Sequence, residues 1–493
     1  MSGFIPDELA EILRGTPALG SAYLVGGCVR DQLLGRRSTD FDVEVFGVSF
    51  DVLEAALASR GRIDRVGRSF GVLKLRTPSG VNIDFSVPRR DSKTGPGHKG
   101  FEVTFDPGIT PKEAAARRDF TINAMMFDPR SDRLLDFFGG EEDLRRRVLR
   151  HTSDAFGEDP LRVLRGMQFA SRFRLTASVE TVAICRPMAP RYSELAVERI
   201  REEWCKWAGE SEVPSLGLRF LEQTNWISQF PELDALRATS QEPEWHPEGD
   251  VFVHTCHCCD ALVELEEWRA AESETRIVLL LAVLAHDFGK PATTRRECKE
   301  GRQRIVSPGH DEAGVPVAEQ FLERIGVPRA IINRVLPLVR CHMAHLQGLT
   351  DRSVRRLSRR LEPENIRDLC VLMTADHFGR PPVPRVIPES IARLGQLAAE
   401  LKIQSSAPGP ILKGRDLIAL GMSPGQRMGR LLTAAYEAQL DGQIRTRNDA
   451  WQWLFSVHDP AMTDEIRQSL KQRIVDAGES DGAKGGASGG AGP

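Results

Sequence analysis

Two aspartates that alternate with apolar residues make the stretch TDFDVEVF, residues 39–46, a candidate for phosphoryl chemistry. As a β-strand, this stretch places Asp40 and Asp42 side by side on one face and its apolar residues on the other. Two carboxylates at this spacing suit hard cations such as Mg²⁺. Metal ions held there can align an attacking hydroxyl with a triphosphate and stabilise the leaving pyrophosphate. The alternative is an edge strand with a solvated acidic face, which is commoner for an isolated pair of this kind.

A pair of glycines precedes this stretch. AYLVGG predicts a buried strand that ends at Gly26 and Gly27, and CVRDQLLG, residues 28–35, predicts a short helix. A glycine turn at the start of a helix exposes main-chain N–H groups, and the missing Cβ atoms let a phosphate approach closely. Arg30 could add a charged contact to the same anion. The combination favours phosphoryl chemistry over a solvated edge strand.

Two later strings could bind the rest of a nucleotide. In RRDFTINAM, residues 117–125, two adjacent arginines supply charged forks for phosphates, and the aspartate can accept from a sugar hydroxyl. In EDPLRVLRG, Asp159 and Arg162 are three residues apart, so on a helix they share a face and could pair with the edge of C or A. Asp84, in VNIDFSV, could be a third carboxylate that acts as general base. Each of these residues also has a plain structural explanation, most often a solvated ion pair.

Histidines recur through the second half, in VFVHTCHCCDAL, LAVLAHDFGK, SPGHDEAG, LVRCHMAHL and TADHFGRPP. Burying a His-Asp doublet without partners is costly, so AHDFGK inside an apolar helix predicts a metal site in preference to core histidines. The three cysteines of HTCHCCD would point to different sides of a helix. We therefore predict that they are core thiols and not zinc ligands.

Together the first strings resemble the class II tRNA nucleotidyltransferase and bacterial poly(A) polymerase family. The resemblance implies a DNA polymerase β-like head in which Asp40 and Asp42 bind two Mg²⁺ ions and, with Asp84, form the catalytic set. RRDFTINAM matches the motif that senses ribose and triphosphate, and the Glu-Asp-x-x-Arg string matches the protein template for the incoming base. The nucleotide-binding residues implied are Gly26, Gly27, Arg30, Arg117, Arg118, Asp119, Asn123, Asp159, Arg162 and Arg165.

The order of the histidines resembles the HD-superfamily phosphohydrolase domain that is fused to some members of this family. The resemblance implies a divalent metal, of unspecified identity, and suggests cyclic phosphates or phosphomonoesters at RNA ends as substrates. The ligands that it implies are His254, His286, Asp287 and Asp376, with His310 and His342 as further ligands of a second metal and His345 as the competitor of His342.

Two segments favour addition of CCA over addition of poly(A). Residues 66–76 lack the basic string typical of poly(A) polymerases, and residues 88–110 resemble the flexible loop that CCA-adding enzymes use when switching from C to A. We therefore predict an enzyme that adds or repairs the 3′-terminal CCA of tRNA from CTP and ATP. The alternatives are poly(A) or A-only addition, a protein that is mainly an HD phosphohydrolase, and a non-catalytic RNA-binding protein with relic motifs.

The strands and helices predicted around these residues indicate an α+β chain. It has a head with a small mixed sheet, and the remainder is all-α. At 493 residues the chain exceeds a single core. We predict the following division: head 1–150, helical neck 151–236, HD domain 237–380, C-terminal helical region in contact with tRNA 381–475, disordered tail 476–493.

Composition limits the partners and the location. The net charge of −3 requires any RNA-binding surface to be local, and the arginine-rich residues 143–151 and 352–360 are candidates. Nine irregularly spaced cysteines predict reduced thiols, and we find neither a leader nor a membrane-length apolar run. These features predict a cytoplasmic protein with no membrane association and no obligate protein partner.

Overall fold

A computed structural model of the chain describes residues 5–64, 71–77, 80–93, 101–299, 301–346, 348–457 and 463–485. It contains two compact units, each built from more than one segment. The first comprises Met1–Gln241, Gly249–Leu280 and Glu319–Pro328, and the second comprises Glu242–Glu248, Leu281–Ala318 and Arg329–Pro493. In the described ranges, no helix is long and apolar enough to cross a membrane.

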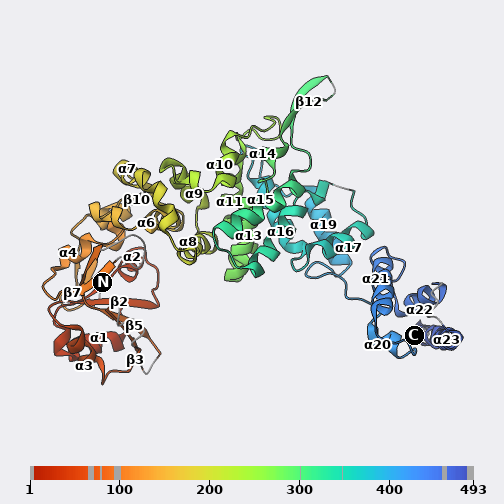
Figure 1. The fold of residues 1–493 in the computed structure, drawn as a ribbon, viewed down its shortest axis with the longest axis horizontal. Coiled ribbons are helices and arrows are strands. Elements are labelled where there is room, and N and C mark those ends of the chain that lie inside the picture. Colours follow the sequence, from red (N-terminus) through yellow and green to blue (C-terminus); the bar gives the residue numbers. More distant parts are fainter. Residues whose placement is uncertain are drawn as a thin grey trace, which may run out of the picture. The chain divides into compact units, whose positions relative to one another are not determined.

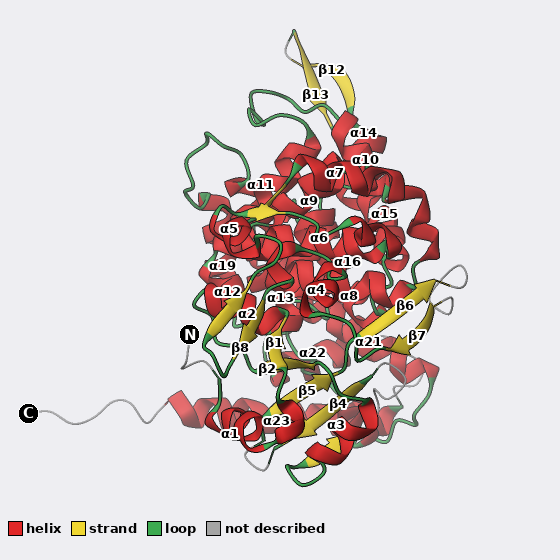
Figure 2. Ribbon diagram, turned by 90° about the vertical axis from the view of Figure 1, so that its left-hand side faces the viewer, coloured by secondary structure: helices red, strands yellow, loops and turns green. Residues whose placement is uncertain are grey.

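A seven-stranded mixed sheet forms the head of the first unit (Figure 2). Its strands run in the order β3-β4-β5-β2-β1-β8-β9, and among the strands that the structure describes in this sheet β2 and β5 are the parallel neighbours. The bounds are β1 (Ala22–Val25), β2 (Asp40–Val45), β3 (Arg62–Asp64), β4 (Val72–Arg76), β5 (Asn82–Ser86), β8 (Met126–Asp128) and β9 (Arg133–Leu135). The predicted alternation holds along β2, because Phe41, Val43 and Val45 are buried while Asp40 and Asp42 are exposed.

Five helices and a separate ribbon accompany this sheet. The helices are α1 (Asp7–Gly15), α2 (Gly27–Leu33), α3 (Phe50–Leu57), α4 (Pro111–Ala116) and α5 (Gly140–Arg145). The segment that resembles a flexible loop contains a two-stranded ribbon of β6 (Arg89–Lys93) and β7 (Phe101–Phe105). Residues 65–70 and 94–100, on which part of the choice between CCA and poly(A) rests, lie outside the described residues.

The rest of the first unit is largely helical, as predicted. Its helices are α6 (Leu161–Phe173), α7 (Val179–Cys185), α8 (Val197–Glu210), α9 (Pro214–Gln223), α10 (Pro231–Asp234), α11 (Val251–Glu264), α12 (Glu266–Ala270) and the first part of α13 (Ser273–Ala285). Helix α6 packs against both α8 and α9. The helix pair α6–α9 is especially close at Gly217, whose N–H donates to Ser171 Oγ at 3.0 Å.

Replacing Gly217 by alanine is expected to lower the free energy of unfolding by about 1–3 kcal/mol, because an added methyl overpacks this contact. A Cβ there would lie 2.6 Å from the Met167 carbonyl oxygen and would also clash with Ser171 Oγ. Denaturant unfolding measures the change. Gly157→Ala is the matched control, since a Cβ at Gly157 meets nothing within 4 Å, and equal loss in both variants would contradict the packing explanation.

The second unit contains the His-Asp doublet, which lies just after the end of α13. Its elements are α14 (Lys290–Thr293), β12 (Arg295–Lys299), β13 (Arg302–Val306), the first part of α15 (His310–Arg324), α16 (Arg329–Cys341), α17 (Asp351–Leu361), α18 (Ile366–Phe378), α19 (Glu389–Glu400), α20 (Gly414–Ile418), α21 (Gln426–Leu440), α22 (Arg447–Ser456) and α23 (Asp464–Gly485) (Figure 1). The two compact units do not coincide with the four predicted domains, so that division stays a prediction.

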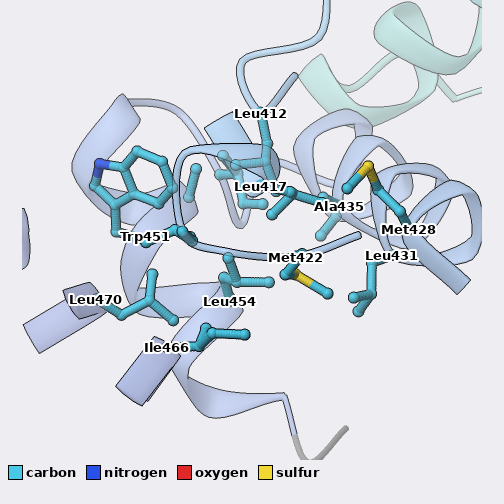
Figure 3. Packing of buried hydrophobic residues seen from close by; sticks show 14 residues of the cluster. Leu412, Leu417, Met422, Met428, Leu431, Ala435, Trp451, Leu454, Ile466 and Leu470 are labelled. Carbon is cyan, nitrogen blue, oxygen red and sulfur yellow. The ribbon is translucent and has the colours of Figure 1, made fainter. Parts of the chain in front are cut away.

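The last four helices enclose a core of their own (Figure 3). Leu417, Trp451 and Leu454 meet Ile466 and Leu470 there, all buried. These last two side chains anchor the start of α23, and a helix once nucleated gains a hydrogen bond for each residue added. The sequence analysis predicted a disordered tail from residue 476, but helix α23 continues to Gly485. Residues 486–493 lie outside the described residues.

Candidate active site and metal centre

Three charged side chains lie in one row across the head sheet. Asp42 on β2 is in register with Asp84 on β5, and Asp84 is in register with Lys74 on β4. Lys74 Nζ is 3.1 Å from Asp84 Oδ2. Asp40 lies two residues before Asp42 on the same face, and all four side chains line one cavity. The structure therefore brings together the three carboxylates that the sequence predicts.

The carboxylates are close enough to influence one another. Asp42 retains contact with solvent, yet the protein around its carboxyl group raises its pKa, an effect that Arg118 opposes and that Asp84 and Asp40 reinforce. Crowded carboxylates of this kind lose their repulsion when they share a cation. The donor set is all oxygen, so it fits hard divalent ions such as Mg²⁺.

The glycine turn stands directly beside these carboxylates. Gly26 has a φ of +72° and precedes α2. A Cβ on Gly26 would lie 3.5 Å from Asp42 Oδ2 and 3.1 Å from Arg118 Nη1. Arg118 is held in place from its other side by Glu44, whose Oε2 is 3.2 Å from Arg118 Nη2. The main chain of the turn, Asp42 and Arg118 thus surround one small volume that an anionic group could occupy.

The structure does not support the predicted contact of Arg30 with a phosphate, because the Arg30 guanidinium points into the protein. Arg30 is only 5% exposed, and it stacks over Phe173 with its Cζ 4.1 Å from the ring centroid. Its Nη1 donates to Asn123 Oδ1 at 2.6 Å, and its Nε and Nη2 donate to Asp31 Oδ1. These internal contacts make Arg30 a residue that joins α2 to the RRDFTINAM segment and not a phosphate ligand.

Asp119 lies at the centre of the RRDFTINAM segment and is buried. Its Oδ1 accepts from the side chain of Asn123 at 3.0 Å, and its Oδ2 accepts from Arg165 Nε at 2.7 Å. Although burial alone would raise it, Arg165 and the hydrogen-bond donors hold the pKa of Asp119 below its ordinary value. Asp119 therefore couples the head to α6 through Arg165, whose guanidinium also lies over the ring of Phe169.

The face-sharing argument for Asp159 and Arg162 was wrong. Asp159 has an extended backbone before α6, and its Oδ1 caps the N–H of Leu161, so the pair does not lie on one helix. Asp159 Oδ2 accepts from Arg199 at 2.8 Å. The Arg162 guanidinium donates at 2.7 Å to the carbonyl oxygens of Ala155 and Arg117. Both side chains nevertheless belong to the connection between the head and α6.

Sequence reasoning missed three charged partners in this site. Lys74 alternates with apolar residues on its strand, so pairing the strands in the right register would have found it. Glu44 instead pairs with Arg118, which lies outside the strands, so no strand register signals that contact. Arg199 is the ion-pair partner of Asp159, and its spacing along the chain carried no signal for that contact. Arg117, the first arginine of the RRDFTINAM segment, has its Nη2 3.6 Å from Glu158 Oε2.

In the second unit, three buried histidines turn the same ring atom toward a common centre. Nδ1 of each lies 2.7 Å from the carbonyl oxygen three residues earlier: His286 to Val283, His310 to Ser307, and His342 to Val339. A carbonyl can only accept, so Nδ1 carries the proton and Nε2 of the neutral ring keeps its lone pair. Metal-binding histidines are commonly oriented in this way.

The Nε2 atoms converge on Asp287. His286 Nε2 is 3.1 Å from Asp287 Oδ2, and His310 Nε2 is 3.4 Å from Asp287 Oδ1. His310 Nε2 is also 3.1 Å from His342 Nε2, so two lone pairs face each other unless a cation lies between them. Burial, reinforced by His286 and His310, lowers the pKa of His342 to about 3, which disfavours a proton as that cation. The geometry fits a divalent metal.

Asp376 and Lys290 complete the polar surroundings of this cluster. Although burial alone would lower it, Asp287 and Asp376 raise the pKa of His286. Ligand atoms of His286 and Asp376 lie within 4.8 Å of each other. Lys290 Nζ, which the sequence analysis did not single out, is 2.7 Å from Asp287 Oδ2. The structure therefore brings five of the predicted HD residues together, including both proposed extra ligands.

Two remaining histidines are placed differently. His345 turns its Nδ1 to Met373 Sδ at 2.9 Å, so His342 and not His345 lies against His310. His254 is buried on α11 of the first unit, where its Nε2 is 3.3 Å from Cys258 Sγ. A ligand role for His254 stays a prediction. Burial raises the pKa of the neighbouring thiols Cys256 and Cys259, as expected for core cysteines.

Comparison with known proteins defines the class. The model of the Poly A polymerase head domain matches residues 22–150, and the model of the HD domain matches residues 251–380. The chain is thus a nucleotidyltransferase-type head followed by an HD domain, and both of these families depend on metal ions.

Curated relatives narrow this class to one family. The multifunctional CCA protein of Halorhodospira halophila is 38% identical over 327 residues, which cover 65% of this chain and 73% of that protein. That of Xylella fastidiosa is 36% identical over 372 residues, which cover 73% and 84%. The chain belongs to the family of multifunctional CCA proteins.

The fold agrees with this assignment. The crystal structure of the Bacillus stearothermophilus CCA-adding enzyme in complex with CTP matches 97% of this chain and 100% of its own length, with a TM-score of 0.62 and 20% identity.

Proposed function

We propose that this protein adds or repairs the 3′-terminal CCA of tRNA, using CTP and ATP, and that its HD domain hydrolyses phosphate esters. The observation that carries the first part is the row of Asp42 and Asp84 beside the Gly26 turn. Membership of the multifunctional CCA family supports it. A cytoplasmic location, which the cysteines in free thiol form favour, belongs to the same proposal.

In the addition reaction, the head residues divide into three roles. Asp40 and Asp42 would hold two Mg²⁺ ions, which supply Lewis-acid activation and neutralise charge on the pyrophosphate. Asp84 accepts the proton of the RNA 3′-hydroxyl as its oxygen attacks the α-phosphorus of the nucleotide. The bond from that phosphorus to the bridging oxygen breaks, and pyrophosphate leaves. Gly26, Gly27 and the Arg117–Arg118 pair bind the triphosphate, and Lys74 holds Asp84 in position by its ion pair.

Selection of C or A falls to the connection between head and α6. Asp159 and Arg162 present an acceptor and a donor to the base edge, and Asp119, Asn123 and Arg165 fix the segment that carries the ribose contact. In the structure, hydrogen bonds to two main-chain carbonyls orient the Arg162 guanidinium, and a hydrogen bond from Arg199 orients the Asp159 carboxylate. Both side chains keep unused hydrogen-bonding capacity, because a guanidinium has five N–H groups and a carboxylate has several lone pairs.

The HD cluster supplies the second activity. His286, Asp287, His310, His342 and Asp376 hold the metal in this proposal, and His254 stays a predicted further ligand. A bound divalent metal would activate water for attack on the phosphorus of a phosphate ester. Lys290 keeps Asp287 ionised and oriented through its 2.7 Å contact. As the resemblance to the HD phosphohydrolases implies, cyclic phosphates or phosphomonoesters at RNA ends are the proposed substrates.

The direct test is incorporation of nucleotides into tRNA that lacks its last three residues. With CTP and ATP together, the expected product ends in C-C-A and is extended no further. A long tail made with ATP alone would assign the protein to the poly(A) polymerases instead. Absence of any incorporation, with hydrolysis of phosphate esters retained, would leave the HD domain as the principal activity.

Arg162→Ala is expected to reduce discrimination between correct and incorrect nucleotides by about tenfold to 100-fold, because one bidentate contact contributes about 1–3 kcal/mol. The apparent affinity for triphosphate should change much less. Single-nucleotide incorporation with each of the four triphosphates measures both quantities. Arg172→Ala, on the same helix, is the control, and an unchanged C and A preference in Arg162→Ala would remove the template role.

A further inference from the structure

A charged hairpin joins two of the metal-binding histidine segments and extends from the second unit. Strands β12 and β13 pair from Arg295↔Val306 to Lys299↔Arg302, and both views show the hairpin projecting beyond the helices of this unit (Figures 1 and 2). Its base is closed by Thr294 Oγ1 and Ser307 Oγ, which are 2.7 Å apart. The carbonyl of Ser307 is the acceptor that orients His310.

An exposed tryptophan is fixed against this hairpin. Trp245 is 47% exposed, and Arg304 on β13 stacks over its ring with Cζ 5.1 Å from the centroid. The loop that carries Trp245 is held by two acidic residues. Glu244 accepts from Arg304 at 2.6 Å, and Glu242 accepts from the N–H of Ile305 at 2.8 Å. An aromatic ring held this firmly and yet exposed is a ready stacking platform for a flat ligand.

The two faces of the hairpin differ in what they present. Side chains alternate along a strand, so Arg302 and Arg304 lie on one face, together with Glu297, which is opposite Arg304. Because Arg304 stacks on Trp245, this is also the face of Trp245. Arg302 on this face and Arg296 on the opposite face are both exposed. On this face Glu244 compensates the charge of Arg304, and Glu297 compensates that of Arg295. Arg302 is a further exposed arginine on the same face.

We propose that the Trp245 face of the hairpin binds the single-stranded 3′ end of an RNA whose terminal phosphate enters the HD metal centre. A base stacks on Trp245, and Arg302 contacts the phosphate backbone. His310 lies six positions after Arg304, so the platform lies within about 20 Å of the metal-binding segment, which a few nucleotides can span. Bases inside a double helix are already stacked on one another, so a base that is free to stack on the ring within the strand comes from single-stranded RNA. This inference rests on the proposed hydrolysis of RNA-end phosphates.

The test compares two substrates in the full-length protein. One is a single-stranded RNA that ends in a 2′,3′-cyclic phosphate, and the other is bis(p-nitrophenyl) phosphate, which is too small to reach the hairpin. Trp245→Ala is expected to raise KM for the RNA about tenfold, with kcat and the small ester unchanged. Arg302→Ala is expected to reduce the salt dependence of that KM by about 0.7 in a log–log plot.

Arg296→Ala is the matched control, because it removes the same charge from the opposite face and should leave KM and its salt dependence unchanged. A second readout is independent of turnover: 4-thiouridine placed near the RNA 3′ end should cross-link to the peptide that contains residues 242–248. CCA addition should be unaffected in all three variants, which also shows that they fold.

Several outcomes would overturn the inference. Unchanged KM in Trp245→Ala, cross-links elsewhere, or equal effects of Arg296→Ala and Arg302→Ala would remove the hairpin as the RNA contact. Equal KM for a fully duplexed RNA end would exclude the stacking role. Failure of the wild-type protein to cleave either substrate would instead reject the HD activity, and the hairpin inference with it.

Discussion

Asp42→Asn should reduce nucleotide addition by at least about 10³-fold, because it removes one of the three carboxylate charges proposed to serve the metal ions and the proton transfer. A loss of about 4 kcal/mol of transition-state stabilisation corresponds to this factor, and a bound metal commonly contributes several kcal/mol. The neighbours Asp40 and Asp84 cannot replace it, because Asp42 both lies in register with Asp84 and stands beside the Gly26 turn, where a Cβ on Gly26 would lie 3.5 Å from Asp42 Oδ2. Incorporation of CTP into shortened tRNA measures the effect.

The same variant separates chemistry from folding. Asp84, Asp40 and burial together destabilise the charged form of Asp42, so the neutral amide should not lower the melting temperature in a metal-free buffer. Hydrolysis of a phosphate ester by the HD domain should also be retained, because that cluster belongs to the other compact unit. Loss of both activities, or a melting temperature well below that of the wild type, would contradict the role assigned to Asp42.

The second large effect is expected from His342→Ala. Its Nε2 faces that of His310 at 3.1 Å, so its removal takes one ligand from the proposed centre. Loss of an outer-shell partner alone typically costs 10-fold to 100-fold in affinity or activity, and loss of a ligand should cost at least about 100-fold in hydrolysis. Elemental analysis of the purified protein should show reduced metal content, with CCA addition unchanged.

His345→Ala is the matched control for this variant. His345 lies three residues further on, contacts Met373 Sδ at 2.9 Å, and keeps partial exposure. Its removal should leave metal content and hydrolysis within about threefold of the wild type, as for most substitutions outside a site. If His345→Ala lost metal and His342→Ala did not, the geometry of the cluster would be misassigned.

Local pattern was enough to predict much of this protein. The alternation in residues 39–46 predicted the strand of Asp40 and Asp42 and the face on which they lie, because side chains alternate along any strand. The histidine doublet predicted a polar centre, because burying it alone is costly, although it lies in the turn after the apolar helix α13 and not within that helix. The α+β head, the helical remainder and the family followed from strings of residues that are close together in the chain.

The predictions that failed depended on where a helix begins or where a side chain turns. Helix α6 begins at Leu161 with Pro160 as its N-cap, so Asp159 lies outside the helix and its spacing to Arg162 does not place the two side chains on one face. Arg30 turned inward because Asn123, 93 residues later, and the ring of Phe173 satisfy its guanidinium better than solvent does. Such partners are invisible in a local window.

The sequence by itself determined the chemical groups of both sites and most of the secondary structure that carries them, since these depend on residue type and short-range periodicity. Only the tertiary structure decided the register that puts Lys74 and Asp84 beside Asp42, the choice of His342 over His345, and the contact between Trp245 and Arg304. The physical reason is that strand pairing and helix packing join residues far apart in the chain, and the net free energy of the whole fold selects those pairings.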